Sequence, residues 1–259
     1  MMSVMCERLN FIIEEIRSAY EKYGEPSEKT LSDKSRFDLV TSVDLNIEKY
    51  LIERILERYP DDKILSEETN SDTAIEGKTW TIDPIDGTYN MANGIRVWGI
   101  QCAMYDGGKP VLSAILLPHF GELYYAEAGK GAYLNGMPIR VSPRDLEHCT
   151  VSFGDFPHTR QRDFELEHKI MRDLSSRIAK IRMFGAACMD FTCVASGKTS
   201  GTVIFTRNKW DITPGILLCR EAGALIMDID GEYSEGSAEV IAVSSKELYD
   251  CIKDAALAD

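Results

Sequence analysis

Two aspartates three residues apart follow a short apolar run in the first third of the chain. The segment 80–88 reads WTIDPIDGT, so Asp83 and Asp86 stand where a strand-like run ends. Carboxylates placed in this way can share hard cations such as Mg²⁺. Gly87 and Thr88 can begin a helix, whose free N–H groups suit a phosphate. Cation and phosphate would then meet at one point, although a plain turn with Asp86 as a helix cap fits the same residues.

Two further acidic motifs stand upstream, and each has a structural alternative. Glu67 and Glu68 follow a short apolar run, where they can add a metal ligand or form an exposed acidic loop. Asp44 belongs to a Thr41-x-x-Asp44 pattern at the start of a helical segment. That pattern fits a capping box, and it also fits a carboxylate that orients a water or a hydroxyl.

A further acid lies far downstream, in the segment 209–215, which reads KWDITPG. Asp211 precedes an apolar run, and Pro214 suits the first turn of a helix, so Asp211 is predicted to be the N-cap. A carboxylate has two oxygens, so a capping role does not exclude metal binding.

The composition is that of an ordinary globular protein with a strong negative charge. Of 259 residues, 44% are hydrophobic and 27% are charged, and the net charge is −13. A chain this acidic repels phosphate backbones and anionic lipids, which argues against nucleic acid and membranes as partners. An anionic substrate can still bind where bound cations reverse the local field.

The cysteines and the N-terminal segment favour a cytoplasmic protein. The seven cysteines are widely spaced and odd in number, and they form no C-x-x-C, so buried reduced thiols are expected. The first residues include Glu7, Glu14 and Glu15 and contain no long apolar stretch. We therefore expect neither a signal peptide nor a membrane span.

Hydrophobic periodicity predicts the elements that carry these residues. Helical spacing at 5–20 and 47–59 predicts two amphipathic helices, separated by a polar loop at 27–36. Further helices are expected at 164–174, 186–195 and 212–222, and Ser244-x-x-Glu247 opens a last one as a capping box. Strands are expected at 64–65, 80–82, 97–104, 111–117, 123–126, 150–153, 178–183, 202–205, 225–227 and 240–243, with a turn-rich stretch at 129–141.

These elements predict one catalytic unit over 1–259. Its first half, 1–145, is of α+β type and carries most of the candidate ligands. Its second half, 146–259, alternates strands and helices in α/β fashion and carries Asp211 with the substrate-binding segments. The two halves are expected to fuse into one layered structure.

Taken together, the motifs resemble those of inositol monophosphatases. The ordered set is D-L-V-T-x-x-D at 38–44, E-E at 67–68, W-x-x-D-P-I-D-G-T at 80–88, and W-D at 210–211 with E-A-G downstream. The connecting segments GKGAYLNG at 129–136 and RMFGAA at 182–187 are also similar. The resemblance extends from about Asp38 to Ser245.

The resemblance implies a fold, an assembly and a metal site. The fold is an α+β five-layered αβαβα sandwich of the inositol monophosphatase and fructose-1,6-bisphosphatase type, assembled as a homodimer. Two to three Mg²⁺ ions are implied per subunit, with Mn²⁺ as an alternative. One ion is held by Glu67, Asp83 and the Ile85 carbonyl, a second by Asp83, Asp86 and Asp211, and a third by Glu67 and water. The all-oxygen donor set suits Mg²⁺ better than Zn²⁺, because no motif includes His119, His148, His158 or His168.

The resemblance also implies roles in catalysis and substrate binding. Thr88 and Asp44 accept the proton of the attacking water, and Glu67 joins them as a catalytic residue through its metal and water. The phosphate is held by the backbone N–H groups of Gly87 and Thr88. Asp86 and groups near Gly185 and Ala187 bind a substrate hydroxyl.

Some positions depart from the family pattern. Animal-type members carry a glutamate six residues before the Trp-Asp pair, and here that position is Ile204. Arg207 and Lys209 lie beside this gap, either as a solvated basic loop or as ligands of a second phosphate. The second phosphate would be that of fructose 1,6-bisphosphate or the 2′-phosphate of NADP. Lys34, in the polar loop, is aligned with a segment that closes over the third metal.

We therefore predict a Mg²⁺-dependent phosphomonoesterase that hydrolyses inositol 1-phosphate or a related small sugar phosphate. The alternatives are a fructose-1,6-bisphosphatase or bifunctional enzyme, and an NADP or nucleotide phosphatase. Relatives that act on 3′-phosphoadenosine 5′-phosphate typically continue D-G-T with Lys-Gly, whereas this chain has Tyr89 and Asn90. A further alternative is a non-catalytic metal-binding homologue, but metal binding alone has no need for Asp44 and Thr88.

Overall fold

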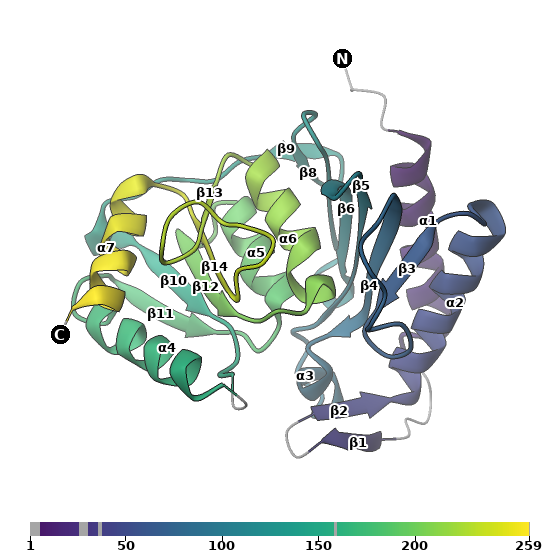
Figure 1. Cartoon of the computed structure of the whole chain (residues 1–259), viewed down its shortest axis with the longest axis horizontal. Helices are drawn as coiled ribbons and strands as arrows, with labels where there is room; N and C mark the ends of the chain where they lie inside the picture. The colour runs from purple at the N-terminus through teal and green to yellow at the C-terminus, as the bar shows by residue number, and fades with distance from the viewer. Residues whose placement is uncertain (1–5, 26–30, 36–37, 158–159, 259) are drawn as a thin grey trace.

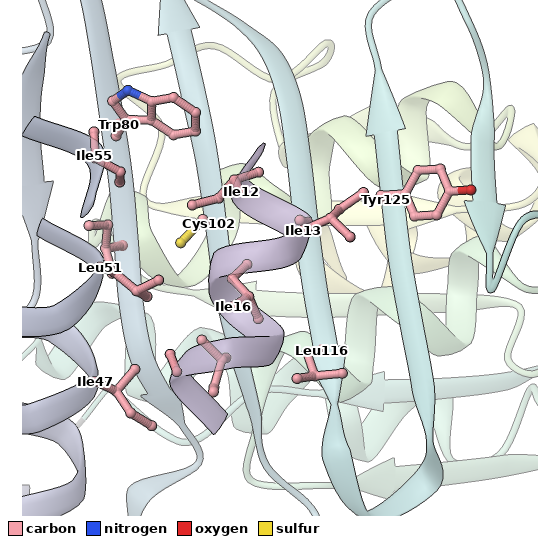
Figure 2. Close-up of a cluster of buried hydrophobic side chains, with 14 of the residues drawn as sticks. Ile12, Ile13, Ile16, Ile47, Leu51, Ile55, Trp80, Cys102, Leu116 and Tyr125 are labelled. Carbon is pink, nitrogen blue, oxygen red and sulfur yellow. The ribbon is translucent and has the colours of Figure 1, made fainter. Parts of the chain in front are cut away.

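Two long helices cover the outer face of a large sheet in the first half of the chain. The computed structural model describes residues 6–25, 31–35, 38–157 and 160–258 (Figure 1). Helix α1 (Glu7–Tyr23) and helix α2 (Ser42–Arg58) each bury one apolar stripe, because apolar residues recur every three or four positions. Figure 2 shows both stripes packed toward the strands that carry Trp80, Cys102, Leu116 and Tyr125.

The large sheet has seven strands in sequential order. Strand β3 runs parallel to β4, and every later neighbour pair is antiparallel. Asp106, Gly107 and Gly108 lie at the turn between β5 and β6, as predicted. The strands are β3 (Lys63–Ser66), β4 (Lys78–Asp86), β5 (Gly99–Asp106), β6 (Lys109–Leu117), β7 (Glu122–Glu127), β8 (Ala132–Leu134) and β9 (Met137–Ile139).

The second half builds a five-stranded mixed sheet in the order β11-β10-β12-β14-β13. Its strands are β10 (Thr150–Phe153), β11 (Lys180–Met183), β12 (Gly201–Phe205), β13 (Leu225–Met227) and β14 (Glu239–Val243). Strand β10 is parallel to both β11 and β12, so the carboxyl ends of these three strands point the same way.

Two pairs of helices complete the layers. Helices α5 (Ala187–Ala195) and α6 (Lys209–Glu221) lie between the two sheets, where their apolar side chains join residues of both. Helices α4 (Gln161–Leu174) and α7 (Lys246–Leu257) cover the outer face of the smaller sheet. The order across the molecule is helices, sheet, helices, sheet, helices (Figure 1). The predicted five-layered α+β sandwich is confirmed.

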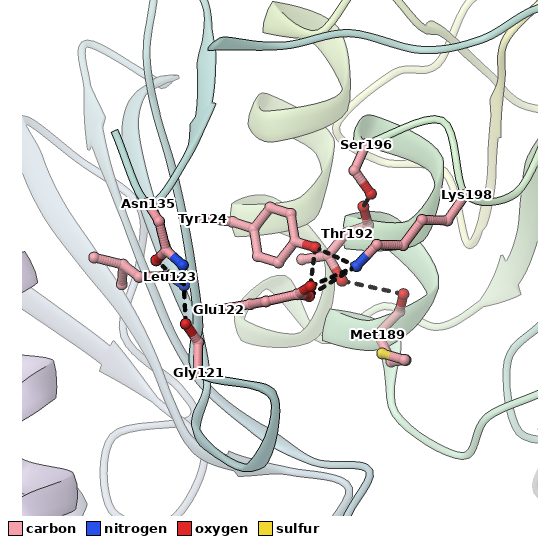
Figure 3. Close-up of polar contacts among 9 residues, drawn as sticks. All are labelled: Gly121, Glu122, Leu123, Tyr124, Asn135, Met189, Thr192, Ser196 and Lys198. Atoms are coloured by element: carbon pink, nitrogen blue, oxygen red, sulfur yellow. Dashed lines mark hydrogen bonds and ion pairs between the residues drawn. The ribbon is translucent and has the colours of Figure 1, made fainter. Parts of the chain in front are cut away.

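A polar cluster joins the large sheet to the end of α5. Lys198 Nζ lies 2.8 Å from both carboxylate oxygens of Glu122 and 2.9 Å from the hydroxyl of Tyr124 (Figure 3). The Tyr124 hydroxyl donates in turn to Glu122 at 2.7 Å. These contacts link strand β7 with the turn after α5, and therefore the two halves of the chain.

Two predicted loops contain strands. Part of the polar stretch at 27–36 forms β1 (Leu31–Ser35), which pairs antiparallel with β2 (Asp38–Thr41). Within the turn-rich stretch at 129–141, β8 and β9 form a short hairpin at the sheet edge. The stretch at 129–141 is turn-rich as predicted, because turns flank this hairpin. The loop predicted at 27–36 was wrong over Leu31–Ser35, where backbone pairing with β2 defines a strand.

Two helix starts also differ from the prediction. The last helix is capped by Ser245, whose hydroxyl accepts from the Leu248 N–H, and Ser244 lies one residue too early. Helix α6 begins at Lys209, so Asp211 lies inside its first turn and is not the N-cap. Pro214 lies inside the helix. The two aromatic and basic residues before Asp211 continue the helix upstream of the apolar run from which its start was predicted.

The structure can be compared with two further predictions, that the cysteines are buried reduced thiols and that the chain has no membrane span. All seven cysteines are free, and all except Cys6 are buried. Among the described residues, no helix is both long and apolar enough to cross a membrane.

Candidate active site

An irregularity in β4 turns both aspartates of the DPID segment toward one pocket. In the pairing of β4 with β5, Asp83 lies opposite Gln101 and Asp86 lies opposite Gly99, so three steps on β4 match two on β5. Pro84 occupies this irregularity, where a residue without an N–H loses no ladder bond. Residues three apart on a regular strand face opposite sides, whereas an extra residue restores them to the same side.

Asp83 is buried and surrounded by other acids. Its Oδ2 accepts a hydrogen bond from Gln101 Nε2 at 3.2 Å, while its Oδ1 has no hydrogen-bond partner among the described residues. Burial, and then the negative charges of Glu67, Asp86 and Asp211, hold the pKa of Asp83 well above its usual range. The carboxylate is therefore costly to ionise without a compensating positive charge.

Asp86 binds the first turn of a helix from the other half of the chain. Its carboxylate accepts the backbone N–H of Ala187 at 3.1 Å and also that of Cys188, the first two residues of α5. Burial raises the pKa of Asp86 to about 6, although these N–H groups act in the opposite direction. An exposed helix start favours a negative charge, which explains why α5 docks on this carboxylate.

Asp44 makes contacts both within its own motif and with Thr88. It forms the predicted capping box with Thr41 at the start of α2. Its Oδ1 also lies 3.0 Å from the hydroxyl of Thr88, the first residue of the short helix α3 (Thr88–Ala92). The same hydroxyl lies 2.8 Å from the Ile85 carbonyl, so it donates to one acceptor at a time. Burial raises the pKa of Asp44, and the hydrogen bonds from Thr41 and Thr88 lower it.

Glu67 follows β3 and is held at the pocket by its backbone. The Glu67 N–H donates to the Ile82 carbonyl at 3.2 Å. The next residue is anchored by the buried Glu48 of α2, which accepts the Glu68 N–H at 2.8 Å and the Thr69 hydroxyl at 2.5 Å. A buried carboxylate thus fixes the turn that presents Glu67.

Asp211 enters the pocket from the first turn of α6. Thr206 donates to its Oδ2 at 3.2 Å. Burial, and then the charges of Glu67 and Asp86, hold the pKa of Asp211 well above its usual range. Acidic side chains from both halves of the chain therefore line the same pocket.

One pocket of about 430 Å³ collects nearly all the predicted site residues. Its lining includes the predicted Glu67, Asp83, Ile85, Asp86, Gly87, Thr88, Gly185, Ala187, Arg207 and Asp211. Asp44 is fully buried behind Thr88 and does not line the pocket. Lys209 is turned away, since its Nζ lies 3.0 Å from the Tyr233 hydroxyl and also contacts Glu235. The Lys34 side chain lies outside the described part of the structure.

The sequence reading missed several lining residues. Asp155, Phe156 and Arg160 lie in the segment after β10 and form one wall of the pocket. The carboxyl ends of parallel strands commonly carry binding residues, and β10 is parallel to both of its neighbours. The predicted strand at 150–153 therefore held the signal that could have identified Asp155.

The pocket chemistry fits a hard cation, although no finished cage is formed. Within the described ranges, no three Asp, Glu, His or Cys side chains converge closely enough to make a ready metal-binding group. The described lining contains no His or Cys, so the side chains there that can bind a metal would do so through oxygen, as Mg²⁺ prefers. Asp83 Oδ1 is the clearest sign, because it is a buried acceptor that no described donor satisfies.

Comparison with known proteins agrees with this geometry. The inositol monophosphatase family model matches residues 2–257. A fructose-1,6-bisphosphatase/inositol-1-monophosphatase of Aquifex aeolicus is 33% identical over 233 residues, which cover 90% of this chain and 87% of the relative. A putative Nus factor SuhB of Neisseria meningitidis serogroup B is 36% identical over 221 residues, covering 83% and 84%.

A solved structure extends the comparison to three dimensions. An IMPase/NADP phosphatase complexed with Mg²⁺ and phosphate superposes with a TM-score of 0.81 at 25% identity, covering 96% of this chain and 93% of the other. The family match spans nearly the whole chain, and the layers, the carboxylate pocket and the motif order all agree with it. The chain therefore belongs to the inositol monophosphatase family and is a phosphomonoesterase of that type.

Proposed function

We propose that this phosphomonoesterase depends on Mg²⁺ and hydrolyses inositol 1-phosphate or a related small sugar phosphate. The observation that carries the proposal is the meeting of four acids from both halves of the chain, Glu67, Asp83, Asp86 and Asp211, in one pocket beside Thr88. Four acids in one pocket repel one another and repel phosphate, so they are useful only with cations. The Mg²⁺ and phosphate in the related solved phosphatase support this reading.

The residues that would hold Mg²⁺ are Glu67, Asp83, Asp86, Asp211 and the Ile85 carbonyl. Because no three of the acids converge fully, small side-chain rotations must accompany binding. When bound, Mg²⁺ makes a water more acidic and neutralises charge on the phosphate and the leaving oxygen. Mn²⁺, which also accepts oxygen ligands, is an alternative.

The Thr88 and Asp44 pair supplies the proton acceptor. Asp44 cannot touch a water in the pocket directly, because it is buried behind Thr88. Thr88 Oγ1 lies 3.0 Å from Asp44 Oδ1 and also lines the pocket. We therefore infer that Thr88 accepts the proton of the attacking water while passing its own proton to Asp44. The backbone N–H groups of Gly87 and Thr88 would hold the phosphate.

Phosphate release from a substrate panel at millimolar Mg²⁺ tests the proposed function. The panel contains inositol 1-phosphate, fructose 1,6-bisphosphate, glucose 1-phosphate, NADP and 3′-phosphoadenosine 5′-phosphate. We expect inositol 1-phosphate or a sugar phosphate to lead, and EDTA to abolish release. Release that EDTA does not affect would overturn the metal requirement. Faster hydrolysis of NADP or the adenosine bisphosphate would move the substrate class to nucleotides.

Arg207 provides a test for a second phosphate on the substrate. It is exposed and lines the pocket, whereas Lys209 is held by Tyr233 and Glu235. A charge-assisted bond to phosphate is worth about 1.5–3 kcal/mol. We expect Arg207→Ala to lower kcat/KM for fructose 1,6-bisphosphate roughly 10-fold or more beyond its effect on inositol 1-phosphate. Equal losses on both substrates, or the same pattern in the exposed control Arg182→Ala, would contradict a phosphate-binding role.

Asp155 is proposed to replace the glutamate that the family pattern places at Ile204. Strand β10 continues beside β12, so a side chain at Gly154 would lie 3.2 Å from Ile204 Cγ2, and Asp155 follows immediately. Both Asp155 and Ile204 line the pocket. A carboxylate at this wall can accept a hydrogen bond from a hydroxyl of the polyol. In relatives with the glutamate, that residue would accept this hydrogen bond.

An exchange of these two side chains tests this role of Asp155. We expect Asp155→Ala to raise KM for inositol 1-phosphate about 10-fold or more, the cost of one hydrogen bond to a charged group. Hydrolysis of p-nitrophenyl phosphate, which has no sugar hydroxyl, should change much less. Adding Ile204→Glu to Asp155→Ala should recover part of the lost affinity. An equal effect on both substrates, without recovery in the double variant, would show that Asp155 does not contact the polyol.

A further inference from the structure

Gln101 joins the two halves of the candidate metal site through a single nitrogen atom. It lies on β5, opposite Asp83 on β4, and its side chain is completely buried. Its Nε2 donates to Asp83 Oδ2 at 3.2 Å and to the backbone carbonyl of Asp211 at 3.2 Å. One amide group therefore bonds to a carboxylate from the first half and to the first turn of a helix from the second.

The chemistry of this position requires a primary amide of this length. An NH₂ group offers two N–H donors on one nitrogen without adding a charge, whereas a hydroxyl offers one. Both partners of Gln101 Nε2 are acceptors, so the reversed amide would place oxygen against oxygen. The Oε1 atom is buried and has no donor among the described residues. Leaving a buried acceptor unpaired costs free energy, which the two hydrogen bonds made by Nε2 must offset.

We propose that Gln101 is a positioning residue that sets the placement of Asp83 relative to the first turn of α6, and thereby the cation affinity of the pocket. The inference rests on the proposed metal site. Asp211 reaches the pocket from that same turn, so fixing its carbonyl also fixes the base of its side chain. Hydrogen-bonded partners of metal ligands orient them, and losing such a partner typically lowers metal affinity or activity about 10–100-fold.

Measuring the melting temperature at increasing concentrations of Mg²⁺, without substrate, tests the inference without relying on turnover. A ligand that binds the folded protein raises the melting temperature in a concentration-dependent way. In Gln101→Met, which has similar length and no donors, we expect about 10–100-fold more Mg²⁺ to be needed for the same rise in melting temperature. Raising Mg²⁺ should then restore phosphate release, because the reacting groups remain in place. Gln101→Asn keeps the amide but is one methylene shorter, so its shift should lie between wild type and Gln101→Met.

Two controls separate failure of this inference from failure of the proposed function. Ser113→Ala removes from the neighbouring strand β6 a buried hydroxyl that has no hydrogen-bond partner among the described residues, and it should titrate like wild type. Asp83→Asn should lose the Mg²⁺-dependent shift altogether.

If Gln101→Met titrates like wild type while Asp83→Asn loses the shift, the positioning role is overturned and the metal site stands. If Asp83→Asn also titrates like wild type, the metal site itself is wrong, and the role of Gln101 falls with it. If Gln101→Met does not fold, Gln101→Asn decides the test. A Mg²⁺ dependence of its melting temperature equal to that of wild type would overturn the positioning role of Gln101.

Discussion

Asp83→Asn is expected to abolish Mg²⁺-dependent phosphate release and, at the same time, to stabilise the metal-free protein. Loss of a residue that merely supports a metal ligand costs about 10–100-fold. Asp83 is proposed to contact two ions itself, so we expect a loss of at least about 100-fold on this scale. The stability gain arises because the carboxylate is buried among three other acids, and an amide of the same shape carries no charge.

The two effects can be measured on the same preparations. Phosphate release is followed at saturating Mg²⁺, and melting temperature is followed in EDTA at pH 8. The pKa of Asp83 in the folded protein is raised, so its penalty is present when the group would be ionised and disappears under acidic conditions. The stability gain should therefore shrink as the pH is lowered. An active variant, or a variant that is less stable in EDTA at pH 8, would contradict the placement of Asp83 at the centre of the acidic pocket.

Glu167→Gln is expected to stabilise the protein strongly at alkaline pH without removing a substrate contact. Glu167 is buried beneath α4, and neither carboxylate oxygen has a hydrogen-bond partner among the described residues. Burial, and then the charge of Asp155, raise the pKa of Glu167 from 4.5 to about 8. Each pKa unit corresponds to about 1.36 kcal/mol, so full ionisation in the folded state costs on the order of 5 kcal/mol.

The pH window follows from the direction of this shift. Below pH 4.5 the group is protonated in both states, and the penalty is absent. Between 4.5 and about 8 the unfolded chain is ionised and the folded protein is not, so stability declines as the pH rises. Urea unfolding at pH 5 and pH 9 should show a gain for Glu167→Gln that is much larger at pH 9. The exposed Glu165→Gln on the same helix is the matched control. Equal gains in the free energy of unfolding at the two pH values would show that burial does not raise the pKa of Glu167.

The motifs pointed to acids that the structure gathers in one pocket, because these acids stand at the ends of apolar runs. A strand that is buried over most of its length, such as β4, can be recognised in the sequence as an apolar run. Polar residues at the end of such a run are then expected at the end of the strand. Asp44 shows the limit of local reading. The sequence offered a capping box and a carboxylate that orients a water or a hydroxyl as alternatives. The structure shows the capping box together with a hydrogen bond from the Thr88 hydroxyl.

Features that depend on pairing between distant segments were not predictable. Gln101 looks like any polar residue in a strand until the register places it opposite Asp83. The strands β1, β8 and β9 lack apolar alternation and are defined by their neighbours. The start of α6 was placed too late because the apolar run begins after Asp211, while the helix continues upstream through polar and aromatic residues.

The hydrogen bonds of Asp86 to α5 and of Gln101 to Asp211 have a consequence for the time at which the pocket can form in a living cell. A ribosome that has released residues up to 200 has already delivered Glu67, Asp83 and Asp86, but not Asp211. Until α6 has emerged and docked, Asp86 can bind only α5 from the second half, and Asp211 is missing from the pocket. With Asp211 as a proposed Mg²⁺ ligand, we expect catalytic competence to arise only after α6 has emerged and docked.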